Sequence, residues 1–244
     1  MKSLGKFMMF LNRLFTNREP FKVYVKLFFE ECMIIGIDTL PLVAVTGLFM
    51  GAVTAVQSAY NLYSPLIPKY LIGTMVRDMT LTELAPTIIG IIFAGKVGSN
   101  IAGQLGTMRI TEQIDALEVM GINSASYLIL PKIFACTAMY PLLVILGASL
   151  SLFGGYGAGL LSSLYTSEEY TYGLRYAFDS FIPTFAIIKA FVFAFLVATI
   201  SAYKGYFTEG GAYEVGIAST QAVTNSCIAI LCSDYLLANL LMSR

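Results

Sequence analysis

Two long stretches of this chain contain no charged side chain. Residues 39–68 and 133–167 lack Asp, Glu, Lys and Arg, and each stretch is longer than the ~20 residues with which a helix crosses the hydrocarbon of a bilayer. The chain is 57% hydrophobic and 12% charged, whereas a soluble domain is about 25% charged. Lipid offers no partner to bare backbone groups and alternation of period two is weak, so the sequence predicts an all-α integral membrane protein.

Five transmembrane helices fit the hydrophobic pattern best. The predicted spans are residues 31–60, 81–103, 127–153, 181–203 and 215–241, within a transmembrane domain of residues 31–244. An alternative with six spans places a hairpin at "GGYGAG", residues 154–159. The charge-free run around it has only ~35 residues, which barely cover two crossings and a turn, so five spans are favoured.

The N-terminal segment, residues 1–30, is predicted to form an amphipathic helix at the membrane interface. Its basic residues Lys2, Lys6 and Arg13 lie off a hydrophobic stripe with helical spacing, which consists of Leu4, Phe7, Met8, Leu11 and Phe15. This pattern is typical of a helix lying on an anionic surface. A disordered basic tail is the alternative, and a signal peptide is disfavoured because the run "FMMFL" is short and no cleavage site of small residues follows.

Basic residues are distributed unevenly about the predicted spans, and this distribution predicts the orientation. With the N-terminus in the cytoplasm, ten basic residues lie inside: Lys2, Lys6, Arg13, Arg18, Lys22, Lys26, Lys96, Arg109, Lys132 and Lys204. Four lie outside: Lys69, Arg77, Arg175 and Arg244. We therefore expect a cytoplasmic N-terminus and a C-terminus on the outer side.

Several chemistries are excluded by composition. The chain has no histidine, which removes HExxH zinc sites, Ser-His hydrolysis and His-ligated haem. Its cysteines lie in or beside apolar segments without a metal spacing, and we interpret them as packing residues: Cys32, Cys136, Cys227 and Cys232.

One near-match to a nucleotide site is false. "GIIFAGKV", residues 90–97, almost spells a P-loop, but Val97 stands where the Mg²⁺-binding Ser or Thr belongs and no strand precedes it. The small residues of this region favour close helix contact instead: Gly95, Gly98, Ser99, Ala102 and Gly103. Packing or a chain break is likewise the interpretation of "GGYGAG". Nucleotide chemistry has to come from another chain.

A small acidic helix is predicted over about residues 109–122, which include "TEQIDALEVMG". On a helical wheel Ile114, Leu117 and Met120 gather near Ile110, and the acids Glu112, Asp115 and Glu118 lie opposite. Such a helix can rest its apolar face on the membrane domain and show its carboxylates to a cytoplasmic partner. An ordinary solvated loop helix is the alternative.

Charged residues within the spans need compensation. An ionisable side chain near the bilayer centre costs about 2.5–3.5 kcal/mol on insertion scales, and Glu83, Lys189 and Asp234 are such residues. The helical rise places Lys189 and Asp234 in the outer half of antiparallel neighbours, where they can form a structural ion pair. Tyr60 and Asn61 end the first span, and snorkelling is their simplest interpretation.

"TELAPTIIGIIFAGKVGSNIAGQLGTMRITEQIDALEVMGI", residues 82–122, resembles the MlaE/YrbE family, the permease subunits of lipid-transporting ABC systems with MCE-domain partners. The likeness extends to "MGAVTAVQSAY", residues 50–60, and "YKGYFTEGGAYEVGIASTQAVTNSCIAILCSDYLL", residues 203–237, and covers most of the chain from about residue 31. Many relatives carry Arg before the matching Glu83, where this chain has Thr82, so no role is expected from an Arg-Glu pair.

The resemblance implies a homodimeric permease in the bacterial inner membrane that moves phospholipid between the inner and outer membranes. It implies three further proteins: a cytoplasmic ABC ATPase that binds the ATP, a periplasmic MCE-domain protein, and a small STAS-domain protein on the ATPase. The permease itself then needs no cofactor or metal, catalyses no reaction and binds no nucleic acid. Residues 109–122 become the coupling helix, which contacts the ATPase through Glu112, Asp115, Leu117, Glu118 and Met120.

A lipid cavity is predicted at the outer ends of the first, second and fifth spans. An apolar wall with polar groups at head-group level is supplied by Leu48, Val53, Val56, Gln57, Tyr60, Asn61 and Glu83. Lys189 can attract phosphate as a point charge, with Asp234 holding it. Two other functions are less favoured: a membrane-embedded enzyme lacks its G-x-G-D or G-x-S-x-G motif, and an ion channel lacks a filter sequence.

Overall fold

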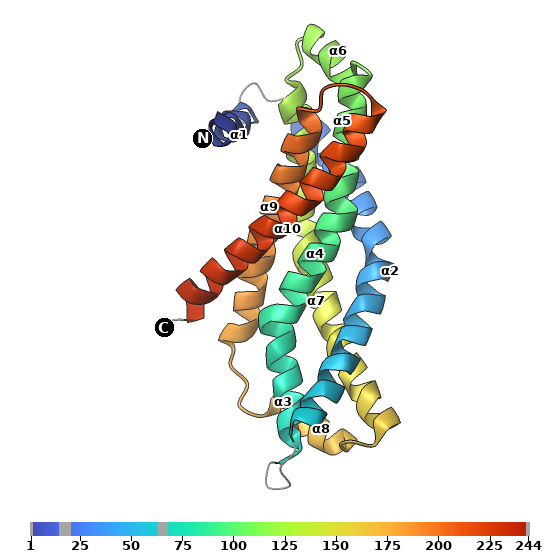
Figure 1. The fold of residues 1–244 in the computed structure, drawn as a ribbon, viewed down its shortest axis with the longest axis vertical. Coiled ribbons are helices and arrows are strands. Elements are labelled where there is room, and N and C mark those ends of the chain that lie inside the picture. Colours follow the sequence, from blue (N-terminus) through green and yellow to red (C-terminus); the bar gives the residue numbers. More distant parts are fainter. Residues whose placement is uncertain (1, 15–20, 63–67, 243–244) are drawn as a thin grey trace. The chain divides into compact units, whose positions relative to one another are not determined.

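The computed structural model describes residues 2–14, 21–62 and 68–242, which form helices and no strand. Figure 1 shows their course. Ten elements are α-helical: α1 (Lys2–Arg13), α2 (Phe21–Asn61), α3 (Tyr70–Met79), α4 (Ile89–Phe93), α5 (Ser99–Ile110), α6 (Gln113–Val119), α7 (Ser124–Ser162), α8 (Ser167–Arg175), α9 (Phe181–Tyr206) and α10 (Ala212–Met242). Two π-helical stretches, η1 (Thr80–Ile88) and η2 (Ala94–Gly98), lie on either side of α4.

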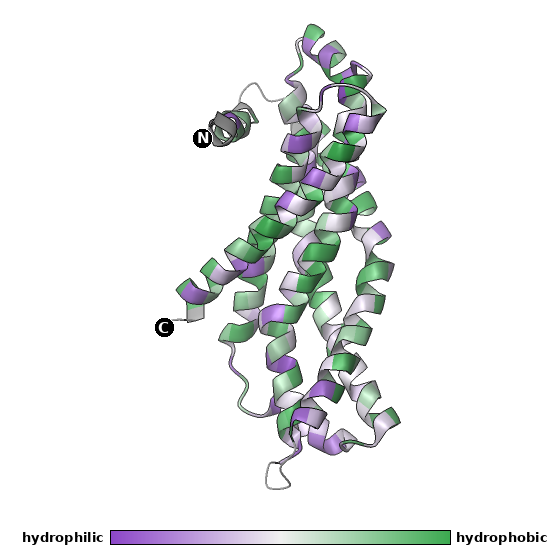
Figure 2. Ribbon diagram, viewed as in Figure 1, coloured by the Kyte–Doolittle hydropathy of each residue, from purple (hydrophilic) through white to green (hydrophobic). Residues whose placement is uncertain are grey.

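Five helical segments are long and apolar enough to cross a membrane, which confirms the all-α membrane fold. They are Lys22–Asn61, Tyr70–Ile110, Ser124–Ser162, Phe181–Tyr206 and Ala212–Leu241, and hydrophobic residues predominate along them (Figure 2). Most of the helices extend beyond the predicted spans, because a helix can continue into water once its side chains become polar. At the start of α2, for example, Lys26 and Glu30 form an exposed ion pair with spacing i, i+4.

The six-span alternative is wrong, because α7 remains helical through "GGYGAG". The glycines there serve packing. A side chain at Gly154 would collide with the backbone of Leu48 in α2, and one at Gly155 would collide with the ring of Tyr170 in α8. Helix–helix contact at this distance requires the absence of a Cβ.

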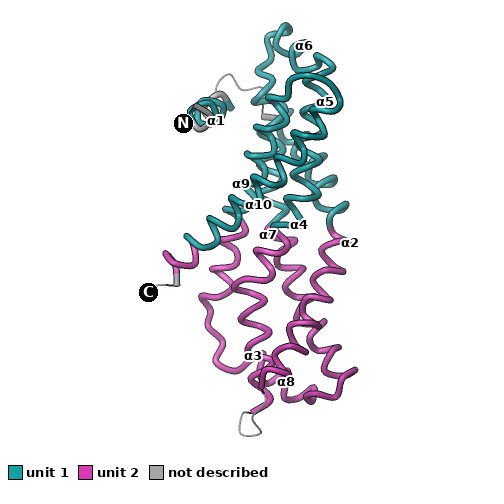
Figure 3. The backbone as a smooth tube through the Cα atoms, viewed as in Figure 1, with its two compact units in different colours: residues 1–39, 91–140, 191–236 teal, residues 40–90, 141–190, 237–244 magenta. Residues whose placement is uncertain are grey.

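The described backbone forms two compact units, shown in Figure 3. Unit 1 consists of residues 1–39, 91–140 and 191–236, and unit 2 of residues 40–90, 141–190 and 237–244. The helices α2, α7, α9 and α10 and the second span therefore contribute residues to both units.

Unit 2 has its own core at α3 and α8. The buried residues of this cluster are Ala55, Ile72, Val76, Tyr165 and Tyr170. Burial raises the pKa of Tyr165 to about 12, and its hydroxyl donates to the carbonyl of Gly155 over 2.5 Å. The core therefore includes phenol groups whose polar ends are satisfied by the α7 backbone.

Unit 1 confirms the small-residue packing predicted from the second span. A Cβ at Gly98 would lie 2.8 Å from the hydroxyl of Ser201 in α9, and one at Gly103 would lie 3.4 Å from that of Ser219 in α10. Ala102 is fully buried. Gly95 is exposed with open space beside it, so it takes no part in this packing.

The N-terminal helix α1 also belongs to unit 1. The Phe10 ring of α1 is buried and packs on aromatic side chains at the end of α9, whereas Met8 is 64% exposed. Residues 21–30 are part of α2 and not of the amphipathic helix. The side chains of Lys2, Leu4, Leu11 and Arg13 are not described, and Phe15, Arg18 and Arg244 lie outside the described residues.

Candidate functional site

Lys189 is the most deeply buried charge in unit 2. Its side chain, from α9, is fully buried, and its Nζ lies 3.0 Å from Oε1 of Glu83 and 3.0 Å from the carbonyl oxygen of Thr82, both in η1. The Phe185 ring lies one helical turn away, with its centroid 4.5 Å from Nζ. A carboxylate, a carbonyl and an aromatic face together compensate the ammonium.

The carbonyl of Thr82 lacks its α-helical partner because of the local sequence. In a regular α-helix it would accept from the N–H of residue 86, but residue 86 is proline and has no N–H. The backbone widens here into the π-helical η1, which contains Pro86. Such π-helical turns occur frequently at functional sites.

Glu83 differs from its partner in exposure. Its side chain is 47% exposed, whereas that of Lys189 is not exposed at all. A bound molecule would therefore meet the carboxylate before the ammonium. The structure gives Lys189 a partner in Glu83, while Asp234 lies in α10 within unit 1. The predicted proximity of Asp234 and Lys189 stays a prediction.

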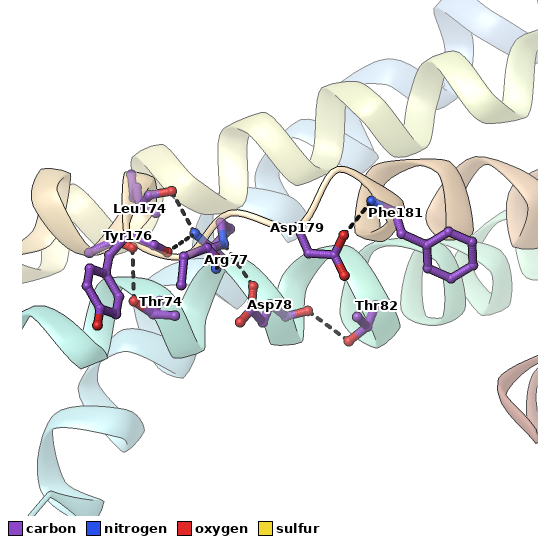
Figure 4. A network of polar contacts seen from close by, with 10 residues as sticks. Thr74, Arg77, Asp78, Thr82, Leu174, Tyr176, Asp179 and Phe181 are labelled. Carbon is purple, nitrogen blue, oxygen red and sulfur yellow. Dashed lines mark hydrogen bonds and ion pairs between the residues drawn. The ribbon is translucent and has the colours of Figure 1, made fainter. Parts of the chain in front are cut away.

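A second polar network holds the elements that carry this pair, as Figure 4 shows. Arg77 of α3 is 3% exposed and donates from Nη1 to the carbonyls of Leu174 (2.9 Å) and Tyr176 (2.8 Å). Its Nε donates to Asp78 over 2.8 Å. The connection from α8 to α9 is thereby fastened to the helix that continues into η1.

Arg77 was predicted only as a charge on the outer side, and α8 was not predicted at all. Nothing in the sequence distinguishes Arg77 from other basic residues. A signal for α8 was present, because Thr166 and Glu169 have the spacing of a capping box. In the structure the Thr166 side chain accepts from the Glu169 N–H, and the Glu169 side chain accepts from the Thr166 N–H.

Of the predicted cavity wall, Val53, Gln57 and Tyr60 lie on one face of α2, because they are spaced four and three residues apart, whereas Leu48 lies about half a turn round the helix from Gln57. Leu48 and Val53 are 42% and 55% exposed, Tyr60 is 57% exposed, and Gln57 and Asn61 are also exposed. Val56 is half-buried. The other side of this part of α2 is buried against the rest of unit 2 through Val43, Gly47, Gly51, Thr54 and Ala55. Val53, Gln57 and Tyr60 therefore share an exposed surface that changes from apolar to polar toward the end of α2.

Unit 1 contains a buried charged cluster that the sequence interpretation missed. Lys132 of α7 is 6% exposed and donates to Glu31 of α2 over 2.5 Å and to Gln104 of α5 over 2.8 Å. Lys96, the lysine of the false P-loop, lies in η2 and donates to the backbone carbonyl of Asp38 in α2. Both lysines thus fasten α2 to the second span, and the segment around Lys96 is helical and forms no phosphate cradle.

The predicted acidic helix is present but shorter, and it starts after a break. The helix α5 ends at Ile110, and Glu112 takes a left-handed conformation with φ 60° before α6 begins at Gln113. At its other end Gly121 takes φ 80°, which glycine permits without strain. The break changes the phase of α6 relative to Ile110.

The end of α6 at Val119 corrects the helical wheel, which continued the helix through Met120. Ile114 is fully buried and Leu117 is half-buried, as predicted, but Met120 is 66% exposed and not part of the buried face. Its neighbour Val119 is 89% exposed. An apolar pair therefore projects from the end of α6.

Two of the three acids bind side chains of this chain. Asp115 forms an ion pair with Arg109 at 2.5 Å. Glu118 accepts from the hydroxyls of Ser124 (2.9 Å) and Tyr206 (3.1 Å). Glu112, at the left-handed position, is exposed. The surface of α6 is consequently less acidic and more apolar than the sequence predicted.

These observations define a class of protein. Five spanning helices, a buried lysine compensated between two of them, and a short helix between the second and third spans are features of a multi-pass membrane protein with a polar interior.

Comparison with known proteins specifies the class further. The profile of the family described as "Permease MlaE" matches residues 28–240. A protein of Rickettsia bellii called "Probable ABC transporter permease protein" is 38% identical over 98% of this chain and 92% of its own length. One of the same description from Synechocystis is 34% identical over 86% of this chain and 79% of its own length. The chain belongs to the MlaE permease family and is a permease subunit of an ABC transporter, not an enzyme.

A third relative carries a more specific name. The "Intermembrane phospholipid transport system permease protein MlaE" of Haemophilus influenzae is 25% identical over 97% of this chain and 90% of its own length.

Proposed function

We propose that this permease moves phospholipid between the inner and outer membranes of a bacterium, as a homodimer in the inner membrane. The observation that carries the proposal is the exposed face of α2, where apolar Val53 is followed by polar Gln57 and Tyr60. Acyl chains need the first kind of surface and a head group needs the second. The name of the Haemophilus influenzae relative supports the same substrate class.

The Glu83–Lys189 pair is the second part of the proposed lipid path. The half-exposed carboxylate of Glu83 can accept hydrogen bonds from a head group, while Lys189 behind it balances the charge. Asp234 of α10 stays part of the proposed set, because it is an ionisable residue within a spanning segment. A second copy related by a twofold axis would double the lining and leave room between the copies.

Energy for transport is proposed to come from a separate cytoplasmic ABC ATPase that binds ATP and receives α6. The exposed Val119 and Met120 supply the apolar contact, with Glu112 and Leu117 beside them. The distribution of basic residues supports a cytoplasmic N-terminus and a periplasmic C-terminus. An MCE-domain protein on the periplasmic side and a STAS-domain protein on the ATPase complete the proposed assembly.

Photocrosslinking during transport tests the substrate. A photoreactive residue at Gln57 or Glu83 in reconstituted permease–ATPase complex should capture labelled phospholipid in a manner that depends on ATP. The same residue at Phe134, 57% exposed on α7 in unit 1, serves as the membrane-contact control. Capture at Phe134 without capture at Gln57 and Glu83 would remove these residues from the path.

A further inference from the structure

Tyr206, the last residue of α9, contacts both α6 and α1, two helices that are distant in sequence. It is 4% exposed, its hydroxyl lies 2.8 Å from Oγ of Ser124, and it donates to Glu118 Oε1 over 3.1 Å. The Ser124 hydroxyl donates to the same carboxylate oxygen over 2.9 Å. One carboxylate at the end of α6 is thus held by two hydroxyls from the ends of α7 and α9.

The other side of Tyr206 is covered by α1. The ring of Phe10 is 2% exposed, and its centroid lies 5.7 Å from that of Tyr206, 5.5 Å from that of Tyr203 and 5.7 Å from that of Phe207. Phe7 adds an edge contact with Tyr203 at 5.3 Å. All of these residues lie in unit 1.

The position of Glu118 gives this chain of contacts a consequence for α6. Glu118 directly precedes the exposed pair Val119 and Met120. Hydrogen bonds to an ionised carboxylate are stronger than those between neutral groups. They fix the last turn of α6, and with it the direction in which the two apolar side chains project.

We propose that α1 positions α6 through Tyr206: docking of α1 on the end of α9 holds the phenol ring, the phenol holds Glu118, and Glu118 orients Val119 and Met120. Tyr206 is then a positioning residue and α1 a regulatory element, whose release from α9 weakens the hold on the ATPase. This inference rests on the proposed coupling role of α6. It gives the amphipathic N-terminal helix a task beyond lying on the membrane.

Amide exchange of the full-length permease in lipid nanodiscs tests the contact chain without an ATPase. Tyr206→Phe keeps the ring and loses the hydroxyl, and it should speed exchange at the end of α6 about tenfold, which corresponds to about 1.4 kcal/mol. Tyr203→Phe is the matched control, because Tyr203 packs on Phe10 but lies outside the Glu118 hydrogen bonds. Its exchange in α6 should equal that of the wild type.

Phe10→Ala tests whether α1 acts through Tyr206. It should undock α1, seen as faster exchange in α1 itself, and speed exchange in α6, while the double variant with Tyr206→Phe should be no faster than the faster single variant. If Phe10→Ala does not assemble, Phe10→Leu replaces it, with an expected rise of about threefold from the lost aromatic contacts. The proposal would be overturned if Phe10→Ala undocks α1 but leaves the exchange rate in α6 at its wild-type value. It would also be overturned if the increases in exchange rate of the two single variants multiply in the double variant.

Titration of the ATPase onto the same nanodiscs separates this inference from the proposed function. Tyr206→Phe and Phe10→Ala should each raise the dissociation constant several-fold, and Tyr203→Phe should not. If the wild type binds no ATPase, the coupling role fails while the exchange result stands. If the wild type binds and both variants bind equally well, the positioning role of Tyr206 is overturned.

Discussion

Removing the charge of Glu83 should destabilise the permease much more than removing the charge of Lys189. In Glu83→Gln the ammonium of Lys189 stays fully buried and loses the carboxylate 3.0 Å away. Loss of one partner of a buried ion pair costs about 3–5 kcal/mol. Because Glu83 is 47% exposed, part of its interaction is already screened, and we expect the lower end of that range, about 3 kcal/mol.

Lys189→Met reverses the situation. Methionine fills the space of the lysine stem beside Phe185 and has no charge to compensate, while the remaining carboxylate of Glu83 can be reached by polar solvent or head groups. The expected cost is about 1 kcal/mol, the scale of exposed ion pairs. The double variant should lie within about 1 kcal/mol of Lys189→Met, since neither side chain then carries a charge that needs a partner.

Equilibrium unfolding in mixed micelles, followed by far-ultraviolet circular dichroism, measures these differences. Glu168→Gln is a suitable control, because Glu168 is exposed on α8 and takes part in none of the ion pairs among the described residues. Our reasoning would be refuted by a Lys189→Met variant that is at least as destabilised as Glu83→Gln. A double variant whose loss equals the sum of the single losses would refute it as well.

Four other outcomes are expected. Val53→Trp should block transfer of labelled phospholipid while co-purification of the ATPase survives, because the residue lines an exposed wall and not the α6 contact. Arg77→Ala should destabilise the permease by about 3 kcal/mol in the unfolding assay, since it loses several hydrogen bonds to one buried charge. A cysteine at Val119 should react with an impermeant reagent only from the cytoplasmic side, and reaction from outside would reverse the predicted orientation. Reversing the charge of the three acids should weaken ATPase binding or uncouple hydrolysis from transport; the triple variant combines Glu112→Lys, Asp115→Lys and Glu118→Lys. Normal coupling in this variant would show that the segment is an ordinary solvated loop.

The spans could be predicted because a bilayer fixes the length and composition of anything that crosses it. The residues at which these helices begin and end could not be predicted, since a helix can continue past the membrane interface into water. The second span shows this most clearly: it was predicted to begin at residue 81, but the helix begins at Tyr70. The added segment is α3, which packs against α8. The hydrophobic pattern does not reveal this partner.

The charged residues of the site could be selected from sequence, because each is costly in lipid, but their pairing could not. Helical rise places Lys189 by depth only, and several acids fall near that depth. Pro86 was the available signal, since it removes the α-helical partner of the carbonyl that Lys189 contacts. The exposure of Met120 was missed for another reason: the helical wheel continues the helix through Met120, whereas α6 ends at Val119 and Met120 is its C-terminal cap.

The contact between α2 and α7 has a consequence for how this permease tolerates change. Gly47 lies against the backbone of Gly147, and Gly51 lies against that of Ser151, so no side chain fits at either position of α2. The wall that includes Val53 and Gln57 occupies the other face of the same helix. A deep mutational scan along α2 should therefore alternate between intolerant and permissive positions with the helical period. Cargo preference could be redesigned at the permissive positions while the intolerant face keeps the two helices together.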